Sequence, residues 1–145
     1  VEQPEYNLLH RQRVEQEYAR LYTDHGLGLT IWSPLASGIL TGKYRDGIPE
    51  GSRAALAGYE WLRDGIASAE ANRAVDTVAD IARELDCTPA QVALAWTLKN
   101  PNVSSVITGA SRPEQVVENM AALGVAGRLD DAMTSRLNAL GPSKS

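Results

Sequence analysis

The stretch LGLTIWSPLASGILTGKY, residues 27–44, joins an apolar run to a loop rich in glycine and serine. Residues 27–33 predict a buried strand, because a short apolar run bounded by turn residues is typical of a strand covered on both faces. The loop that follows has glycines for close backbone approach, serine hydroxyls and Lys43, whose ammonium can meet a phosphate as a point charge. The stretch therefore raises the question of phosphate binding.

The loop does not match the phosphate loop of nucleoside triphosphatases. That motif needs four residues between its glycines and a Ser or Thr after the Lys, which holds magnesium. Here three residues separate Gly38 from Gly42, and Tyr44 follows Lys43. The spacing argues against a triphosphatase. The GLG run at residues 26–28 also fails as a dinucleotide fingerprint, since it precedes a strand and lacks the third glycine.

Outward from this stretch, extended and helical segments alternate. Residues 1–7 predict an extended run, because Pro4 disfavours helical geometry before it. A second strand is predicted at residues 103–110. Helices are predicted at residues 11–26, 68–85, 90–100, 111–123 and 130–140 from their apolar spacing. Residues 34–66 predict a long irregular segment because of their many glycines.

Several helix ends have specific signals. Gly26 is expected to end the first helix, and Thr88 with Gln91 has the spacing of a capping box around Pro89. Ser111 and Glu114 have the same spacing, and Asp130 is expected to cap the last helix. The apolar face of the helix at residues 68–85 consists of Ala71, Val75, Val78 and Ile81.

This alternation indicates parallel β/α units. Two full strands and a short extended run are too few to close a barrel. They are also too few for a stable open parallel sheet, which normally has both faces covered. The sequence therefore predicts part of a larger α/β body. The chain also begins at Val1 as if within such a body, so we expect a fragment.

Composition excludes several classes of partner. The chain has 145 residues, 43% of them apolar, which suits one ordinary core. A net charge of −4 argues against nucleic acid as a partner, and a single Cys rules out an internal disulfide and any Cys-rich metal site. No run approaches the roughly 18 apolar residues of a membrane span. We expect no membrane insertion, no metal site and a reducing compartment.

The residues alone leave two interpretations open at each candidate site. Gly109 and Ser111 follow a predicted strand at a helix N-terminus, where an anion or simply a well-capped helix is expected. Arg112 favours the anion, because a guanidinium can hold a phosphate with two hydrogen bonds. Trp32 fits either a core position or stacking on a planar ring, and the core is the simpler interpretation. His10 and His25 are expected at the surface.

Five segments together resemble the aldo-keto reductase superfamily: QPEYNLL, WSPLASGILTGKY, GIPEGSR, GYEWL and GASRPEQVVEN. The branch most similar to them contains potassium-channel β-subunits and bacterial glyceraldehyde 3-phosphate-type reductases. The resemblance runs over nearly the whole chain, in order. It implies that residues 1–145 are the C-terminal part of a single (β/α)8 TIM barrel domain, about strands six to eight with their helices, whose N-terminal part is absent from this chain.

The resemblance implies a cofactor site for NADP(H). Gln3 matches the residue that binds the nicotinamide carboxamide, and Trp32 matches the aromatic that stacks on the nicotinamide ring. The remaining matches are pyrophosphate contacts at Ser33, Leu35 and Ser37, a phosphate-facing cluster of Lys43, Ser52 and Arg53, further phosphate-side contacts at Gly109 and Ser111, and an adenine-side group of Gln115, Glu118 and Asn119. Arg112 joins the expected cofactor-binding residues because its guanidinium lies beside the same helix N-terminus. Gln115, Glu118 and Asn119 lie one turn apart on one helix face.

The implied function is NADPH-dependent reduction of an aldehyde or ketone by the parent barrel. The family's catalytic Asp, Tyr and Lys lie on earlier strands, so no catalytic residue and no metal ligand is expected here, and the chain alone is expected to be inactive. The implied partners are a small carbonyl substrate and the missing N-terminal half, in the cytoplasm, with a homo-oligomer left open. The alternatives are a non-catalytic NADPH-sensing subunit of the channel type and a fragment without a function of its own.

Overall fold

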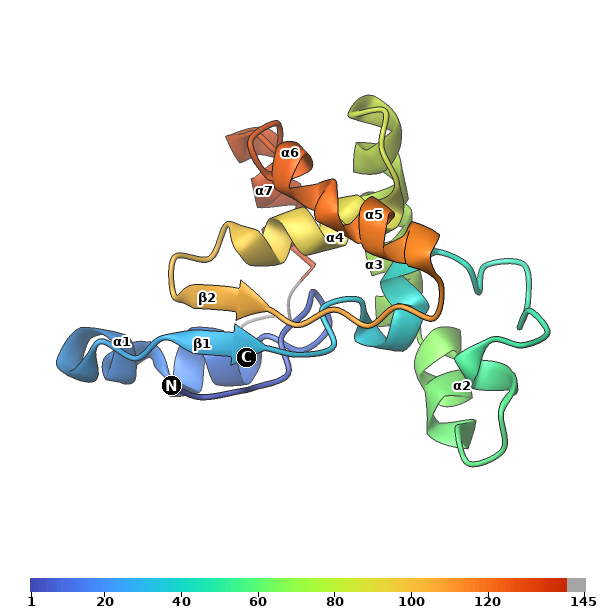
Figure 1. Cartoon of the computed structure of the whole chain (residues 1–145), viewed down its shortest axis with the longest axis horizontal. Coiled ribbons are helices and arrows are strands. Elements are labelled where there is room, and N and C mark those ends of the chain that lie inside the picture. The colour runs from blue at the N-terminus through green and yellow to red at the C-terminus, as the bar shows by residue number, and fades with distance from the viewer. Residues whose placement is uncertain (141–145) are drawn as a thin grey trace.

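A short parallel sheet organises the chain, and the computed structural model describes residues 1–140 of it. Strand β1, Leu29–Ile31, pairs in parallel with β2, Val103–Val106 (Figure 1). The N-terminal segment runs beside the other edge of β1 through isolated parallel bridges, Glu2 to Leu29 and Glu5 to Trp32. The extended run and both strands predicted from the sequence are therefore present, although β1 and β2 are shorter than predicted.

Twelve helices and strands follow in chain order within residues 1–140. Besides the two strands they are the π-helix η1, Arg13–Glu17; α1, Ala19–His25; the 3₁₀ helices η2, Ala36–Thr41, and η3, Arg53–Ala55; α2, Glu60–Ala67; α3, Ala69–Glu84; α4, Pro89–Leu98; α5, Pro113–Met120; α6, Ala122–Ala126; and α7, Asp131–Asn138. No helix within these residues has the length and apolar character needed to cross a membrane.

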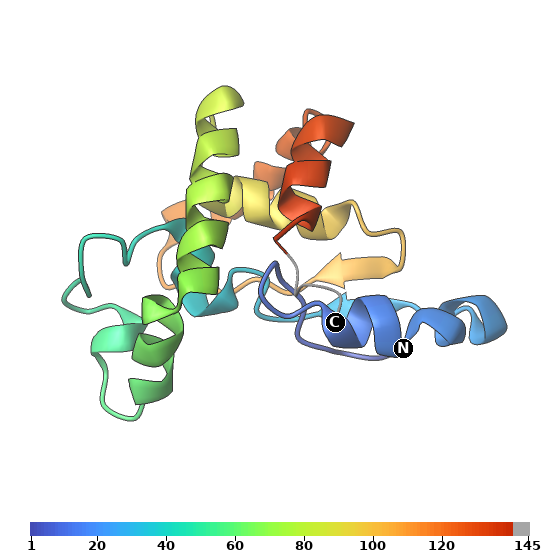
Figure 2. The same cartoon turned by 180° about the vertical axis from the view of Figure 1, so that it is seen from behind.

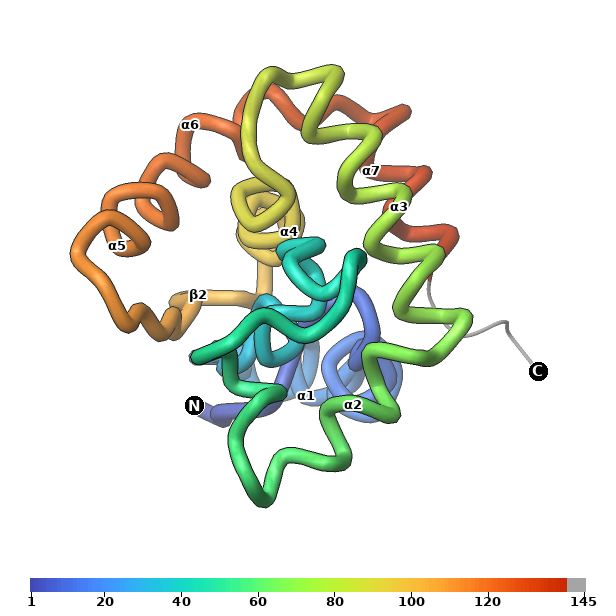
Figure 3. Tube along the Cα trace, turned by 90° about the vertical axis from the view of Figure 1, so that its right-hand side faces the viewer, coloured from blue at the N-terminus to red at the C-terminus, as the bar shows by residue number. Residues whose placement is uncertain are grey.

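The core lies between the sheet and the helices. Leu29 and Ile31 are fully buried, and Val103 and Val106 pack against the same cluster, whereas Thr30 and Ser105 alternate to the opposite face. Seen from behind, α3 and α7 lie on the same side of the sheet as α4 (Figure 2). The side view places α4 between them and the pair α5–α6 (Figure 3). Of α4, residues 90 and 92–97 are all buried, so this helix is the centre of the core.

Three predicted cap positions are confirmed. Thr88 and Gln91 form a reciprocal capping box with Pro89 in the first turn. Gly26 ends α1 with φ of 62°, a left-handed value that favours glycine. The Asp130 carboxylate accepts a hydrogen bond from the Met133 amide at 2.8 Å and so caps α7.

The capping box predicted at Ser111 and Glu114 is wrong. Pro113 occupies the first helical turn and disfavours helical geometry at the residue before it, so Arg112 is extended and is itself the N-cap. The Ser111 amide and hydroxyl instead donate to the side-chain oxygen of Gln115, at 2.8 and 3.1 Å. The single helix predicted at residues 111–123 is divided into α5 and α6. At the division the Ala121 carbonyl accepts a hydrogen bond from Gly124 N–H, three residues along, as in a 3₁₀ turn.

Two further predictions need correction. The helix predicted at residues 11–26 is divided into η1 and α1, with Tyr22 donating to the Val14 carbonyl at 2.7 Å across the break. The segment at residues 34–66 is not irregular throughout, since it contains η2, η3 and α2. Helix α2 was missed because Gly58 and Gly65 flank and interrupt its pattern. Leu62 is nevertheless buried, and the Glu60 carboxylate accepts a bond from the Gly58 amide at 3.2 Å.

Candidate cofactor-binding site

The candidate site begins where three parallel segments end side by side. Tyr6 N–H donates to the Trp32 carbonyl at 3.2 Å, and Trp32 N–H donates to the Pro4 carbonyl at 3.1 Å. On the other edge of β1, Ile107 N–H donates to the Ile31 carbonyl at 2.8 Å. Because the three segments run parallel, the residues that follow β1 and β2 leave the sheet at the same end as Glu5, which pairs with Trp32. In α/β proteins this carboxyl edge carries the ligand sites.

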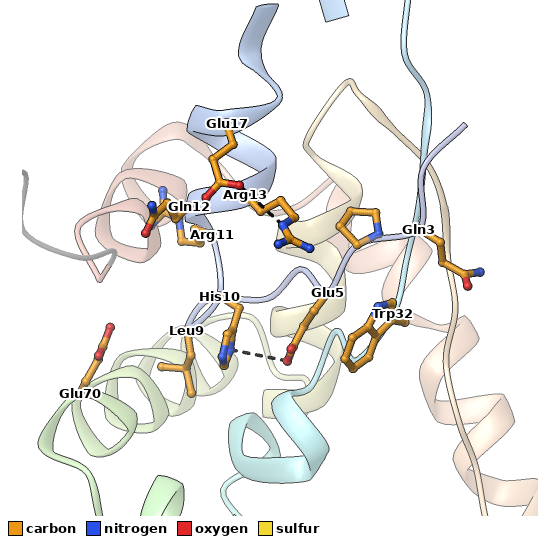
Figure 4. A pocket seen from close by; sticks show the side chains of 11 residues that line it. Gln3, Glu5, Leu9, His10, Arg11, Gln12, Arg13, Glu17, Trp32 and Glu70 are labelled. Carbon is orange, nitrogen blue, oxygen red and sulfur yellow. Dashed lines mark ion pairs between the residues drawn. The ribbon is translucent and has the colours of Figure 1, made fainter. Parts of the chain in front are cut away.

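Trp32 is not a core residue, which corrects the simpler interpretation of its sequence position. Its side chain is 45% exposed, although it directly follows a buried strand. It borders a pocket of about 510 Å³ with Gln3, Glu5 and His10, and Figure 4 shows its indole beside Glu5. His10 is exposed, as predicted, and its Nδ1 lies 3.5 Å from Glu5 Oε1. An exposed indole at a strand end is available to a planar ring.

The loop after Trp32 has an unusual backbone. Ser33, Ala36 and Ser37 have φ of 54°, 48° and 55°, and Gly38 has 92°. For residues other than glycine such values cost on the order of 1–3 kcal/mol each and gather at functional sites. Internal bonds hold the loop, since Ala36 N–H donates to the Ser33 carbonyl at 3.0 Å and Ser37 N–H to the Ser33 hydroxyl at 3.3 Å. Gly38 N–H likewise donates to the Leu35 carbonyl at 2.9 Å, so these three amides stabilise the loop itself.

Lys43 folds back over this loop. A Cβ placed on Gly38 would lie 2.7 Å from Lys43 Nζ, so the ammonium occupies the space that any larger residue at position 38 would need. The same ammonium lies 5.0 Å from the centre of the Tyr44 ring. The glycine is thus favoured by its φ of 92°, whereas the flexible end of the lysine could move away from a larger side chain. The result is a positive charge beside a glycine-containing turn with left-handed φ, an arrangement that suits a phosphate group.

Ser52 and Arg53 lie at the start of η3. The Ser52 hydroxyl is buried and lacks a hydrogen-bond partner within residues 1–140, which is uncommon for a buried polar atom. Arg53 is exposed, and η3 is held by Arg63, whose Nε donates to the Ala54 carbonyl at 2.9 Å. An unpaired hydroxyl next to an exposed guanidinium suits an anionic ligand.

The second group of predicted residues follows β2. Gly109, Ser111 and Arg112 are exposed, and nothing lies within 4 Å of a Cβ placed on Gly109. On α5, Gln115 and Glu118 are half-buried and Asn119 is buried. This helix is attached to α4, because the Gln91 side chain donates to the Glu118 carbonyl at 3.0 Å.

The structure also connects Asn7, a residue outside the predicted set, to the loop. Its side-chain amide donates to the Ser33 carbonyl at 2.9 Å. An Asn directly after an extended segment is a common turn former, and that signal marks the position. Tyr6 beside it is buried and donates to Glu15 at 2.9 Å, and burial raises the pKa of its hydroxyl far above the usual range.

The aldo/keto reductase family model matches residues 1–142. The chain belongs to the aldo/keto reductase family. Members generally use NAD(P)H and form a (β/α)8 barrel, and the parallel strands with their helices agree with part of such a barrel. Within residues 1–140 no three His, Cys, Asp or Glu side chains gather as metal ligands.

Three aldo/keto reductase relatives resemble the chain over nearly its whole length. A probable voltage-gated potassium channel subunit beta of Oryza sativa subsp. japonica is 51% identical over 145 residues, which cover 99% of the chain and 44% of the relative. The protein of the same description from Arabidopsis thaliana is 50% identical over the same shares. A putative voltage-gated potassium channel subunit beta of Schizosaccharomyces pombe is 45% identical, covering 95% and 41%. The chain spans less than half the length of these relatives.

Proposed function

We propose that this chain is the C-terminal part of an NADPH-dependent carbonyl reductase of the cytoplasm and supplies much of its cofactor site. The observation that carries the proposal is the strained loop after Trp32 with Lys43 held above Gly38. It adjoins an exposed indole at the carboxyl edge of a parallel sheet. In this family's barrel, a planar ring and a phosphate would both find partners there.

The residues of the chain fit such a cofactor. Gln3 and Trp32 would hold the nicotinamide end, and Ser33, Leu35 and Ser37 the pyrophosphate. The 2′-phosphate would meet Lys43, Arg53 and the unpaired Ser52 hydroxyl. Residues after β2 and on α5 would hold the rest: Gly109, Ser111, Arg112, Gln115, Glu118 and Asn119. Asn119 is buried, so it would contact adenine only if its side-chain amide were accessible at the surface of α5.

The chemistry that the bound cofactor supplies is hydride donation to an aldehyde or ketone. This chain's part is to bind and orient the cofactor. The proton for the product oxygen would come from a Tyr tuned by a neighbouring Lys in the missing N-terminal part. The small substrate would enter at the same carboxyl edge.

Cofactor choice tests the proposal in the complete protein. Arg53→Ala is expected to weaken NADPH binding by tenfold or more, since a hydrogen bond to a charged group contributes about 1.5–3 kcal/mol. NADH binding should change little, because NADH lacks the 2′-phosphate. The measurement is calorimetric titration with both cofactors. Arg45→Ala is the matched control, since it removes an equal charge nearby from an exposed pair with Asp76. Equal weakening of both cofactors by Arg53→Ala would refute the phosphate assignment.

The relatives' names favour a second function, a regulatory subunit in which bound NADPH serves sensing rather than turnover. Three proteins 45–51% identical to this chain are described as potassium channel β-subunits, two as probable and one as putative. Steady-state turnover separates the two. A reductase should oxidise NADPH with small aldehydes over many cycles, whereas a sensing subunit should retain its cofactor and turn over negligibly.

A further inference from the structure

Asn7 connects the N-terminal segment to the loop after Trp32. It is fully buried, although polar residues seldom are. Its side-chain oxygen accepts from the Leu9 and His10 amides at 2.9 and 3.0 Å. Its side-chain nitrogen donates to Glu5 Oε1 at 3.2 Å and to the Ser33 carbonyl at 2.9 Å. Both the oxygen and the nitrogen of the Asn7 side chain therefore have hydrogen-bond partners.

The oxygen and the nitrogen of this side-chain amide make different kinds of contact. The oxygen closes a turn within its own segment, two and three residues along the chain. The nitrogen reaches 26 residues along the chain to a backbone carbonyl. An ordinary turn asparagine needs only the first set of bonds, so the second set requires a separate explanation.

Ser33 is the residue at which the loop departs from the strand. Its φ of 54° turns the chain out of β1, directly after Trp32. The Ser33 carbonyl accepts from Asn7 and also from Ala36 N–H at 3.0 Å, while its hydroxyl accepts from Ser37 N–H. Because left-handed φ is unfavourable for serine, the conformation persists only where several contacts impose it. Among the described residues, the Asn7 amide gives Ser33 its hydrogen bond from outside the loop, while Ala36 is anchored separately by burial in the core.

We propose that Asn7 is a positioning residue for the cofactor loop, fixing the Ser33 carbonyl so that Trp32 and residues 33–38 keep their ligand-binding arrangement. This inference rests on the proposed cofactor site. Asn7 itself touches no cofactor. It acts by making the loop rigid before the cofactor arrives, so that little ordering is left to be done on binding.

Two variants in the complete protein separate the nitrogen from the oxygen. Asn7→Asp keeps an oxygen for the Leu9 and His10 amides but removes the donor to Ser33. Asn7→Ala removes both the acceptor and the donor without adding a charge. It replaces Asn7→Asp as the test variant if the buried carboxylate prevents folding. Thr97→Val is the control, because Thr97 is also fully buried and donates to the Leu94 carbonyl at 2.7 Å within α4. It tests the general effect of losing a buried hydrogen bond.

Hydrogen exchange without cofactor and NADPH titration are the two readouts. Asn7→Asp should speed amide exchange in residues 33–42 while α3 and α4 keep wild-type protection, and should raise the NADPH Kd tenfold or more. Thr97→Val should leave both the loop exchange and the Kd within twofold of wild type. Wild-type loop exchange or a wild-type Kd in both Asn7 variants overturns the proposal, as does an equal loss in Thr97→Val. If the unmodified protein binds no NADPH, the proposed function fails, and the exchange comparison still decides the role of Asn7.

Discussion

The surroundings of Trp32 in the structure change the interpretation of its role. The sequence places it at the end of an apolar strand, where a buried aromatic is common, yet the structure leaves 45% of its side chain exposed. Ser33 turns the chain sharply after it, and the hydrogen bonds between Trp32 and the N-terminal segment are made by the backbone, which leaves the indole at the border of the pocket. That exposure supports the proposed stacking role.

We expect Trp32→Ala in the complete protein to weaken NADPH binding about tenfold, since aromatic stacking adds roughly 0.5–1.5 kcal/mol to the gain from buried area. The thermal midpoint should hardly change, because the side chain contributes little to the core. Titration by cofactor fluorescence, with a thermal melt, measures both.

Trp61→Ala provides the comparison for that variant. Trp61 is 59% exposed on α2, its ring lies tilted against that of Tyr59 with 6.1 Å between ring centres, and it is not among the proposed cofactor contacts. It should leave NADPH affinity unchanged. A folded Trp32→Ala protein with wild-type affinity would remove Trp32 from the cofactor site.

At the scale of elements, Gln91 joins two helices. Its Oε1 accepts from the Thr88 amide at 3.0 Å and completes the α4 capping box, while its Nε2 donates to the Glu118 carbonyl on α5. Gln91→Glu keeps the cap, because glutamate serves equally in a capping box, but places an oxygen against the Glu118 carbonyl. The substitution therefore separates the attachment of α5 from the stability of α4.

We expect Gln91→Glu to speed hydrogen exchange in α5 and to lower stability by about 1–3 kcal/mol, as for a buried acceptor left unpaired. Thr88→Ala, which removes the other half of the box, should cost about 1 kcal/mol and act on α4 instead. Exchange measured by mass spectrometry in the complete protein locates each effect. Similar α5 protection in the two variants would mean that Gln91 does not hold α5.

At the scale of the molecule, the described part leaves several large apolar side chains in solvent. Exposed apolar side chains gather on α5 and α6 at Val116, Val117, Met120 and Leu123. The outer edge of β2 also pairs with no strand within residues 1–140. Unpaired strand edges and apolar patches of this kind recruit other chains.

We therefore expect residues 1–145, expressed alone, to aggregate or to be ordered only as an oligomer or with a complementary N-terminal part. They should not oxidise NADPH with aldehydes, because the proposed proton donor lies elsewhere. Sedimentation velocity and a thermal melt test the first expectation, and an assay free of other chains tests the second. A monomer with a cooperative melt would contradict the first, and turnover by that monomer the second.

Local signals in the sequence predicted part of this structure correctly. The caps at Thr88, Gln91 and Asp130 and the stop at Gly26 were predictable, because each depends on bonds within a few residues. The Ser111 cap failed for the same kind of local reason, since Pro113 moved the helix start by one residue. The alternation of strands and helices also predicted parallel pairing.

The sequence by itself determined the alternation of extended and helical segments, the helix ends at Gly26, Thr88 and Asp130, and the family, because local hydrogen bonding and a long run of matching motifs specify them. It did not determine α2 or the breaks that divide η1 from α1 and α5 from α6. Only the tertiary structure decided that Trp32 is exposed, that Lys43 lies over Gly38, and that Asn7 reaches Ser33. The Asn7 contact joins residues 26 positions apart. It exists only because β1 and the N-terminal segment pair in register, and that register is a property of the assembled sheet rather than of either segment.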